Sequence, residues 1–316
     1  MPLTLEQYAS YLDTRDLSWP SPPAPRLPRA RAHVVPLPGL RAVIWNIYGT
    51  LLSISGGELV FEHPQDFIME VALDKTLQEF KMWTSMSRKP GQPAEYLRQL
   101  FNRVLSELRM APSPGERHPE IAAERIWEDI IKKLFQKDFK FDAGFFGSLN
   151  EFSRKVAYFF HASLQGTACY PGAAAALSAV RDAGLSQGVS ADAQCFTLVQ
   201  LQRGLTAQDP ACQLADLIDP GLRALSSELG ARKPSERLFR KVLDELARRD
   251  VKPNQVLHIG SRVVQDLAPA RKLGMRTGLF AGDKESLQAD ADQLKDPATR
   301  PDVLLTELAQ IKNVIG

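Results

Sequence analysis

The sequence predicts an α/β protein in which a three-layer, doubly wound, Rossmann-like parallel sheet carries an inserted all-helical cap. Short apolar segments alternate with amphipathic helices, the pattern of a parallel sheet covered on both faces. This alternation fills residues 166–316, and one apolar strand occurs earlier, within 38–60. Residues 61–165 show helical periodicity without a convincing strand, so they are predicted to form the cap.

The N-terminal segment, residues 1–37, predicts a short helix followed by an extended tether. Residues 4–15 place Leu5, Tyr8 and Leu12 on one helical face. The stretch that follows is dense in proline, which fixes φ and removes backbone donors, so no folded element is expected there. A strap lying over the domain is the favoured role. Its arginines also make it a candidate site for a protein partner.

The cap is expected to contain helices at 66–83, 93–110, 119–135 and 145–160. In the first of them, Phe67, Val71, Leu77 and Phe80 recur near helical spacing. Pro93 begins the second helix, since proline is tolerated in a first turn.

The rest of the chain is expected to complete the sheet. Strands are predicted at 185–190, 222–225, 255–260, 277–280 and 303–305. Helices are predicted after Pro171, at 194–204, 211–218 and 235–249, and up to Leu273. The segment 52–64, with its paired glycines, is expected to be a mobile loop.

Composition excludes several classes of protein. Lysine and arginine number 39 against 37 acidic residues, a net charge of +2 in 316 residues, so no global field favours nucleic acid or a membrane surface. The three cysteines are an odd number without a Cys-x-x-Cys pair, which argues against a disulfide framework or a zinc site. No apolar run is long enough for a membrane span, and no secretion signal is evident. A cytoplasmic protein is therefore predicted.

The segment from Val43 to Leu52 is the first candidate functional motif. An apolar strand ends at Trp45 and is followed by Asn-Ile-Tyr-Gly-Thr-Leu. Asn46 and Thr50 are thus expected at the carboxyl end of a parallel strand, where open α/β sheets bind their ligands.

Three further motifs follow in order. Ser190 ends the predicted strand at 185–190, and Arg232-Lys233-Pro234 leads into a helix. Gly260-Ser261 is followed by Asp266, five residues after the serine. With the first motif, this series resembles the haloacid dehalogenase-like (HAD) hydrolase superfamily across roughly 40–60 and 165–310. The resemblance implies a hydrolase with a Rossmann-like core and a cap.

The resemblance also identifies a departure. In that superfamily an aspartate at the place of Asn46 attacks the substrate and forms a covalent intermediate. The Asn46 amide is nearly isosteric with aspartate but is a poor nucleophile, and losing a nucleophile typically lowers turnover by ~10⁴–10⁶-fold. We therefore expect aspartate-dependent hydrolysis to be absent or severely reduced, as in a pseudoenzyme with a degenerate active site.

Tyr48 occupies the place of a second, acid-base aspartate of the phosphatases, and resembles the dehalogenase branch instead. As a catalytic residue it competes with a packed aromatic whose hydroxyl is satisfied. Ser261 and Asp266 are the candidate metal ligands, yet carboxylates are missing at positions 46 and 261, so tight magnesium binding is doubtful. Asp266 can alternatively pair with Arg262 four residues earlier.

Thr50, Ser190 and Lys233 remain as candidate anion-binding residues. A hydroxyl, backbone N–H groups and an ammonium can hold the phosphate or carboxylate of a small anionic molecule. Without a carboxylate at position 46, the lysine is expected to be freer to bind such an anion. Asp192, just after the strand, is expected to be an N-cap.

Two alternatives stay open. The chain could be an active hydrolase of phosphatase or dehalogenase type, acting on an unusual substrate or after Asn46 deamidates. It could instead be a non-catalytic scaffold that uses the Pro-rich tether.

Overall fold

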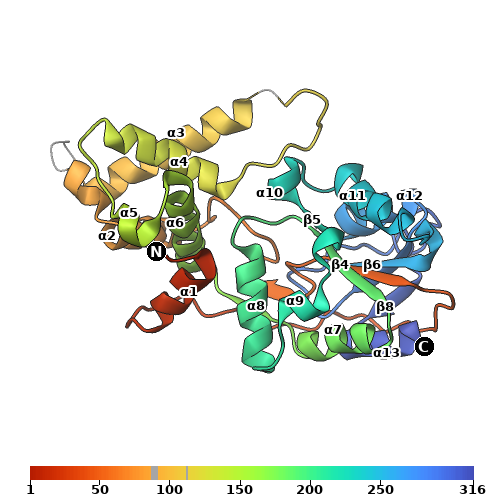
Figure 1. Cartoon of the computed structure of the whole chain (residues 1–316). Helices are drawn as coiled ribbons and strands as arrows, with labels where there is room; N and C mark the ends of the chain where they lie inside the picture. The colour runs from red at the N-terminus through yellow and green to blue at the C-terminus, as the bar shows by residue number, and fades with distance from the viewer. Residues whose placement is uncertain (87–91, 112) are drawn as a thin grey trace.

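Six parallel strands form the central sheet, in the order β5-β4-β1-β6-β7-β8 (Figure 1). The computed structural model describes residues 1–86, 92–111 and 113–316. The strands are β1 (Ala42–Trp45), β4 (Ser186–Ala191), β5 (Arg223–Leu225), β6 (Val256–Gly260), β7 (Arg276–Phe280) and β8 (Val303–Leu305). The chain builds outward from β1 in both directions, so the predicted doubly wound α/β fold is confirmed.

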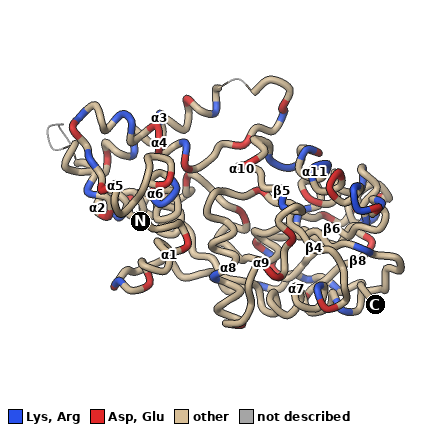
Figure 2. The backbone as a smooth tube through the Cα atoms, in the orientation of Figure 1, with Lys and Arg blue, Asp and Glu red and all other residues tan. Residues whose placement is uncertain are grey.

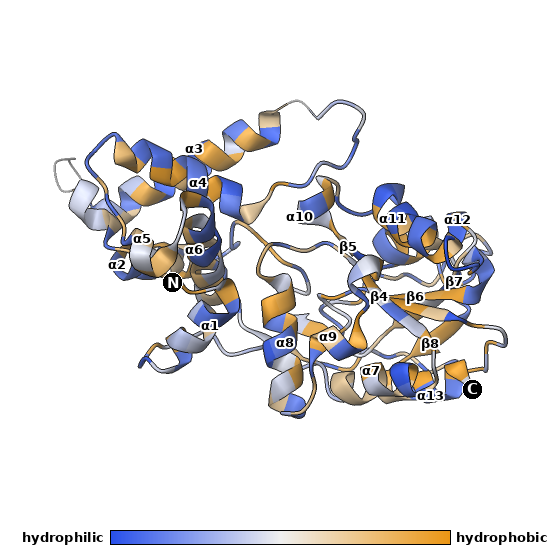
Figure 3. Cartoon of the chain, in the orientation of Figure 1, coloured by the Kyte–Doolittle hydropathy of each residue, from blue (hydrophilic) through white to orange (hydrophobic). Residues whose placement is uncertain are grey.

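Alternate side chains of β1 enter the two helical layers. Val43 and Trp45 belong to a buried cluster with α7 (Ala173–Asp182), α8 (Thr197–Gln208), α9 (Leu214–Leu217) and α13 (Lys312–Ile315). Ala42 and Ile44 belong to a second cluster with α11 (Glu236–Ala247) and α12 (Ala268–Lys272). The outer face of α11 is hydrophilic (Figure 3). Short helical turns connect these elements: α10 (Ser226–Leu229), η2 (Pro220–Leu222), η3 (Pro253–Gln255), the π-helical turn η4 (Val263–Leu267) and η5 (Leu308–Ile311).

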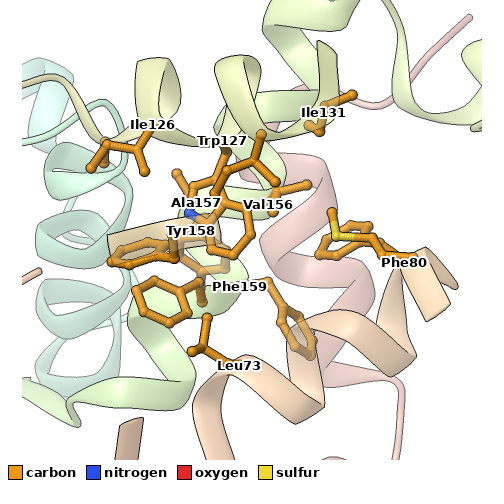
Figure 4. Close-up of a cluster of buried hydrophobic side chains, with 14 of the residues drawn as sticks. Leu73, Phe80, Ile126, Trp127, Ile131, Val156, Ala157, Tyr158 and Phe159 are labelled. Carbon is orange, nitrogen blue, oxygen red and sulfur yellow. The ribbon is translucent and has the colours of Figure 1, made fainter. Parts of the chain in front are cut away.

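The cap consists of helices, with no strand among the described residues of 61–165. They are α2 (Asp66–Glu79), η1 (Met82–Ser85), α3 (Pro93–Met110), α4 (Ala123–Phe135), α5 (Ala143–Phe146) and α6 (Leu149–Leu164). Leu73, Trp127 and Phe159 meet in their shared core (Figure 4). Phe67, one of the apolar residues that recur in α2, is not part of this core, since its exposed fraction is 74%. Packing on α6 selects the face of α2 that carries Met69, Leu73 and Leu77.

The helix predicted at 145–160 is two helices. Gly147, with φ at 89°, ends α5, and Ser148 then begins α6 as its N-cap. The Ser148 side chain accepts a hydrogen bond from the Glu151 N–H, and the Glu151 carboxylate accepts one from the Ser148 N–H. This capping box fixes the start of the helix that crosses the cap.

A two-stranded antiparallel sheet joins the cap to the core. It pairs β2 (Leu52–Ile54) with β3 (Thr167–Cys169), the segments through which the chain enters and leaves the cap. The prediction of a mobile loop at 52–64 is therefore wrong for its first part. Three-residue strands carry too little periodicity to be detected without their partner.

The N-terminal segment lies along the molecule (Figure 1). Helix α1 (Leu5–Asp13) begins at Thr4 and packs beside α6, and residues 14–41 contain no helix. His33 forms an isolated antiparallel bridge with Leu304 on β8. Acidic and basic side chains are interspersed over the backbone (Figure 2). None of the helices in the described ranges has the length and apolarity that a membrane crossing requires.

Candidate functional site

The carboxyl ends of β1, β4 and β6 bring three predicted site residues together. Trp45 is in register with Val189 on one side and with Ile259 on the other. The residues that follow, Asn46 and Ser190, therefore lie side by side, and the Asn46 N–H donates to the Ile259 carbonyl at 2.8 Å. Ser261 follows β6. All three site residues are at most 1% exposed.

Both ends of the Asn46 amide are engaged. Its Nδ2 donates to the Tyr48 carbonyl at 2.8 Å and lies 3.4 Å from the Thr50 Oγ1. Its Oδ1 accepts a hydrogen bond from the Lys233 Nζ at 3.0 Å. The predicted residues Asn46, Thr50 and Lys233 thus form one hydrogen-bonded group. The orientation of the amide follows from a donor on one side and an acceptor on the other.

Lys233 is fully paired inside the protein. Its Nζ donates to the Asp266 Oδ1 at 2.6 Å, and both side chains have zero exposure. The expectation that this ammonium is freer to bind an external anion is therefore wrong. Asp266 is its counter-ion, as a buried ammonium requires, because an isolated charge could not remain buried.

Asp192 also has a different role from the one expected. Its Oδ1 accepts a hydrogen bond from the Lys233 N–H at 2.7 Å, and Phe196 occupies the N-cap position of α8. Asp192 therefore fixes the position of the Lys233 backbone. The spacing of the sequence could not show this, since 41 residues separate the two.

Asp266 is the buried anion of the site. Its Oδ2 accepts hydrogen bonds from the backbone N–H groups of Ser261 at 3.1 Å and Arg262 at 3.0 Å. Burial by itself raises the pKa of Asp266, but the Lys233 ammonium and the Arg262 guanidinium outweigh it and hold that pKa at about 2. Asp266 is therefore ionised at neutral pH.

Arg262 was expected to pair only with Asp266, but it contacts two further carboxylates. It is 5% exposed, and its guanidinium lies 3.3 Å from Asp192, 3.4 Å from Glu58 and 3.8 Å from Asp266. Three carboxylates thus converge on one cation. Glu58 belongs to the segment that enters the cap, so this cluster connects the sheet edge with the cap linker.

Tyr48 points toward α8. Its hydroxyl donates to the Gln200 Oε1 at 2.6 Å and lies 3.0 Å from the Thr197 Oγ1. Burial raises the pKa of this phenol well above its usual value. This geometry fits the packed, satisfied aromatic that was weighed against a catalytic role.

Two hydroxyl groups at the sheet edge have no hydrogen-bond partner. The Ser190 Oγ and the Ser261 Oγ are buried, and neither contacts a donor or acceptor within the described residues. A Cβ added to Gly49 would lie 2.8 Å from the Ser261 Oγ, which places this hydroxyl against the loop of the first motif. A buried hydroxyl without a hydrogen bond lowers the stability of the fold. Each of the two is therefore a donor available to an acceptor from a bound molecule.

The donor set does not fit magnesium. The Tyr48 carbonyl accepts from Asn46, and Asp266 is already paired with Lys233. Position 261 offers a neutral hydroxyl, and the nearby carboxylates of Asp192 and Glu58 are paired with Arg262. Magnesium prefers several oxygen ligands with carboxylates prominent. Over the described ranges, no group of three or more His, Cys, Asp or Glu residues is placed to hold a metal ion.

A cavity of about 220 Å³ lies between this cluster and the cap linkers. Tyr48, Asp192 and Arg262 contribute to its lining from the core. Glu120 lines it from the cap side, and burial raises the pKa of that carboxyl, although the Ser226 hydroxyl donates to it at 2.6 Å. Asn46, Ser190 and Lys233 lie outside the lining. The cavity also contains the apolar side chains Leu59, Val60 and Phe61.

The fold and this site define a Rossmann-like α/β protein with a helical cap, whose polar residues gather at the carboxyl edge of the sheet. Residues 230–311 match the HAD-hydrolase-like family model, a range that includes Lys233, Ser261 and Asp266. No curated protein sequence matches the chain.

Solved structures extend the comparison to most of the chain. The 2-haloacid dehalogenase from Pseudomonas syringae pv. Tomato DC3000 aligns over 86% of this chain and 96% of its own, with 20% identity and a TM-score of 0.50. A HAD phosphatase from Thermococcus onnurineus aligns over 86% and 96%, with 19% identity and a TM-score of 0.47. The likeness to the dehalogenase shows a shared fold. The family match supports the resemblance to HAD-like hydrolases for residues 230–311.

Proposed function

We propose that this chain is a HAD-like protein without hydrolysis by an aspartate nucleophile, and that it binds a small anionic molecule at the sheet edge. The observation that carries the proposal is the double engagement of the Asn46 amide, between the Lys233 ammonium and the Tyr48 carbonyl. A neutral amide held in this way offers no ionised carboxylate to attack a substrate.

The anion site is supported by the hydroxyl groups of Ser190 and Ser261. Each is buried without a protein partner in the described residues, beside a cluster that contains the Lys233 ammonium. An oxygen of a bound phosphate or carboxylate that accepted from either hydroxyl would remove the cost of leaving it unpaired. Because Lys233 is already neutralised by Asp266, the affinity is expected to be modest.

Turnover tests the first half of the proposal. Wild-type protein and the variant Asn46→Ala should give the same background rate with phosphate monoesters and with 2-haloacids. Peptide mass analysis across residue 46 should show asparagine and no deamidated aspartate. Turnover by the wild type that Asn46→Ala abolishes would contradict the proposal.

Calorimetric titration with millimolar phosphate tests the second half. Ser190→Ala should weaken or remove the binding heat, since it deletes one of the two free donors. Ser106→Ala, at an exposed position of α3, is the matched control and should titrate like the wild type. Identical titrations of the wild type and Ser190→Ala would remove the anion site from the proposal.

We further propose that Arg262 takes the place of a magnesium ion as the cation that the carboxylates of this site surround. Its guanidinium already satisfies Asp192, Glu58 and Asp266. Titration of the wild type with Mn²⁺, followed by electron paramagnetic resonance, should show free ion only. Stoichiometric loss of the free Mn²⁺ signal would contradict this assignment.

A further inference from the structure

The N-terminal segment, residues 1–37, contacts both the cap and the core. On the cap, the Leu3 N–H donates to the Phe145 carbonyl at 3.1 Å. Tyr8 has zero exposure, and its ring lies 6.4 Å from Phe80 and 6.1 Å from Phe146 between centroids. Helix α1 is thus part of the aromatic core of the cap.

The same segment then crosses the junction between cap and core. Trp19 packs edge-on against Phe159, with ring centroids 5.2 Å apart. A Cβ added to Gly166 would lie 2.5 Å from the Pro20 carbonyl oxygen and 2.6 Å from the Ser21 carbonyl carbon. Gly166 joins α6 of the cap to β3, so the strap runs directly over the connection on which the cap would turn.

Beyond that crossing the segment is fastened to the core. The Arg26 N–H donates to Asp283 at 3.0 Å. His33 and Leu304 exchange backbone hydrogen bonds of 2.9 and 2.8 Å, which extends the sheet at β8. The Leu37 N–H donates to the Val314 carbonyl at 2.8 Å. The contacts of His33 and Leu37 join backbone groups, so they depend little on side-chain identity, whereas the Arg26 contact requires the Asp283 carboxylate.

A bidentate ion pair completes the connection. The Asp13 carboxylate, at the end of α1, pairs with the Arg203 guanidinium of α8 at 2.6 and 2.7 Å. Arg203 belongs to the core, whereas the rest of α1 is buried in the cap.

We propose that residues 1–37 act as a clamp that holds the cap closed on the core, so that the cap can turn away from the core only when this strap is released. One continuous segment is attached on both sides of Gly166. The cap therefore cannot rotate about that connection without detaching α1 from the cap, residues 26–37 from the core, or the strap from Gly166. This clamp is independent of whether the site hydrolyses or binds.

Cys195 provides a probe of the movement. It lies on the core loop after β4 and packs against the hydrophobic core of the cap. Its environment includes Glu124 and Arg154, both on cap helices. Separation of cap and core would expose this thiol, whereas release of the strap alone would leave it covered.

The experiment measures thiol labelling of Cys195 in the full chain, with Cys169→Ser and Cys212→Ser as background. Asp13→Arg places two guanidinium groups together and should raise the labelling rate about fivefold, the effect of losing an exposed ion pair. Gly166→Val should raise it further, because its side chain would collide with the Pro20 carbonyl. Adding Arg203→Asp to Asp13→Arg should return the rate to within about twofold of the background.

Asp16→Arg is the matched control. Asp16 is exposed, and its substitution changes the charge by the same amount three residues away from Asp13. It should label like the background. Equal rates for the background, Asp13→Arg and Gly166→Val, all folded by circular dichroism, would overturn the proposal.

Native-state hydrogen exchange tests the clamp without any substitution. Exchange of the Leu304 N–H, which is bonded to His33, reports release of the strap. The Arg232 N–H is bonded to the His118 carbonyl of the cap linker at 2.8 Å, so its exchange reports opening of the cap. If the strap must release first, the Arg232 amide cannot open at lower free energy than the Leu304 amide. Exchange of Arg232 through a lower-energy opening would also overturn the proposal.

Discussion

The Lys233–Asp266 pair decides the charge of the site at the scale of single residues. Both side chains are fully buried, and their charged atoms are 2.6 Å apart. Removing one partner leaves the other as an uncompensated charge in the interior, which costs far more than the pair itself contributes.

We predict that Lys233→Met lowers the free energy of unfolding by about 3 kcal/mol, because the buried Asp266 then loses the closer of its two cations and keeps only Arg262, 3.8 Å away. Urea denaturation at neutral pH measures this loss. Lys241→Met, at an exposed position of α11, is the control and should change stability by about 0.5 kcal/mol or less. A small effect of Lys233→Met would mean that water reaches the pair. The double variant Lys233→Met with Asp266→Leu should recover much of the loss.

Buried histidines make stability depend on pH. Burial lowers the pKa of His161 to about 3, and burial together with the nearby Lys233 ammonium lowers that of His258 to about 3. The unfolded chain takes up these protons near pH 6.5. It therefore binds more protons than the folded protein between pH 6.5 and 3, and stability falls as the pH falls through this window.

Each histidine is expected to contribute a slope of up to about 1.4 kcal/mol per pH unit. Denaturant melts between pH 4.5 and 6.5 measure it, a range that excludes Asp266, whose pKa of about 2 matters only in stronger acid. His258→Leu should remove about half of the combined slope, and His161→Leu with His258→Leu most of it. An unchanged slope in the double variant would place the acid sensitivity elsewhere.

At the scale of elements, Gln165 joins the segment that leaves the cap to the segment that enters it. Its Oε1 accepts from the Val60 N–H at 3.0 Å. Its Nε2 donates to the carbonyls of Ser55 at 2.7 Å and Glu58 at 3.0 Å. The side chain is 3% exposed, so it satisfies buried backbone groups of the segment that enters the cap.

We predict that Gln165→Ala lowers the free energy of unfolding by about 1–3 kcal/mol, since it leaves those backbone groups unpaired. It should also raise hydrogen exchange at Val60. Gln99→Ala on α3, where the side chain is exposed, is the matched control and should have little effect. A loss of stability equal to that of the control would show that water replaces the amide.

The boundaries of the helices and strands show where hydrophobic periodicity is sufficient to predict an element from the sequence. Amphipathic helices such as α11 and α3 were predicted close to their observed ends, because one face of each is apolar over several turns. The antiparallel pair β2–β3 was missed, and helical spacing alone did not show that Phe67 lies on the exposed side of α2. In both cases the deciding partner, β3 or α6, is distant in sequence, so local pattern carries no signal of it.

Cap and core share one hydrophobic cluster at the scale of the whole molecule. Phe196 and Val199, from the core, are buried in the same cluster as Trp127 and Phe160 of the cap and Tyr8 of α1. Removing the cap would expose these core side chains to water. The interface is therefore part of the folding core and not a loose contact between independent units.

We predict a single cooperative unfolding transition for cap and core together. Trp127 reports the cap and Trp45 the sheet, so variants that keep only one of these tryptophans should give denaturation curves with the same midpoint. Two midpoints, with the Trp127 signal lost first, would show that the cap unfolds by itself.

The order of motifs along the chain determined the fold class and named Asn46, Ser190, Lys233 and Asp266, because strand ends and short spacings are local properties. Only the tertiary structure decided how those groups combine. Lys233 is neutralised by Asp266, three carboxylates converge on Arg262, and the strap spans cap and core. The physical reason is that buried charge selects its partner by distance in space, and Glu58, Asp192 and Asp266 are far apart in sequence.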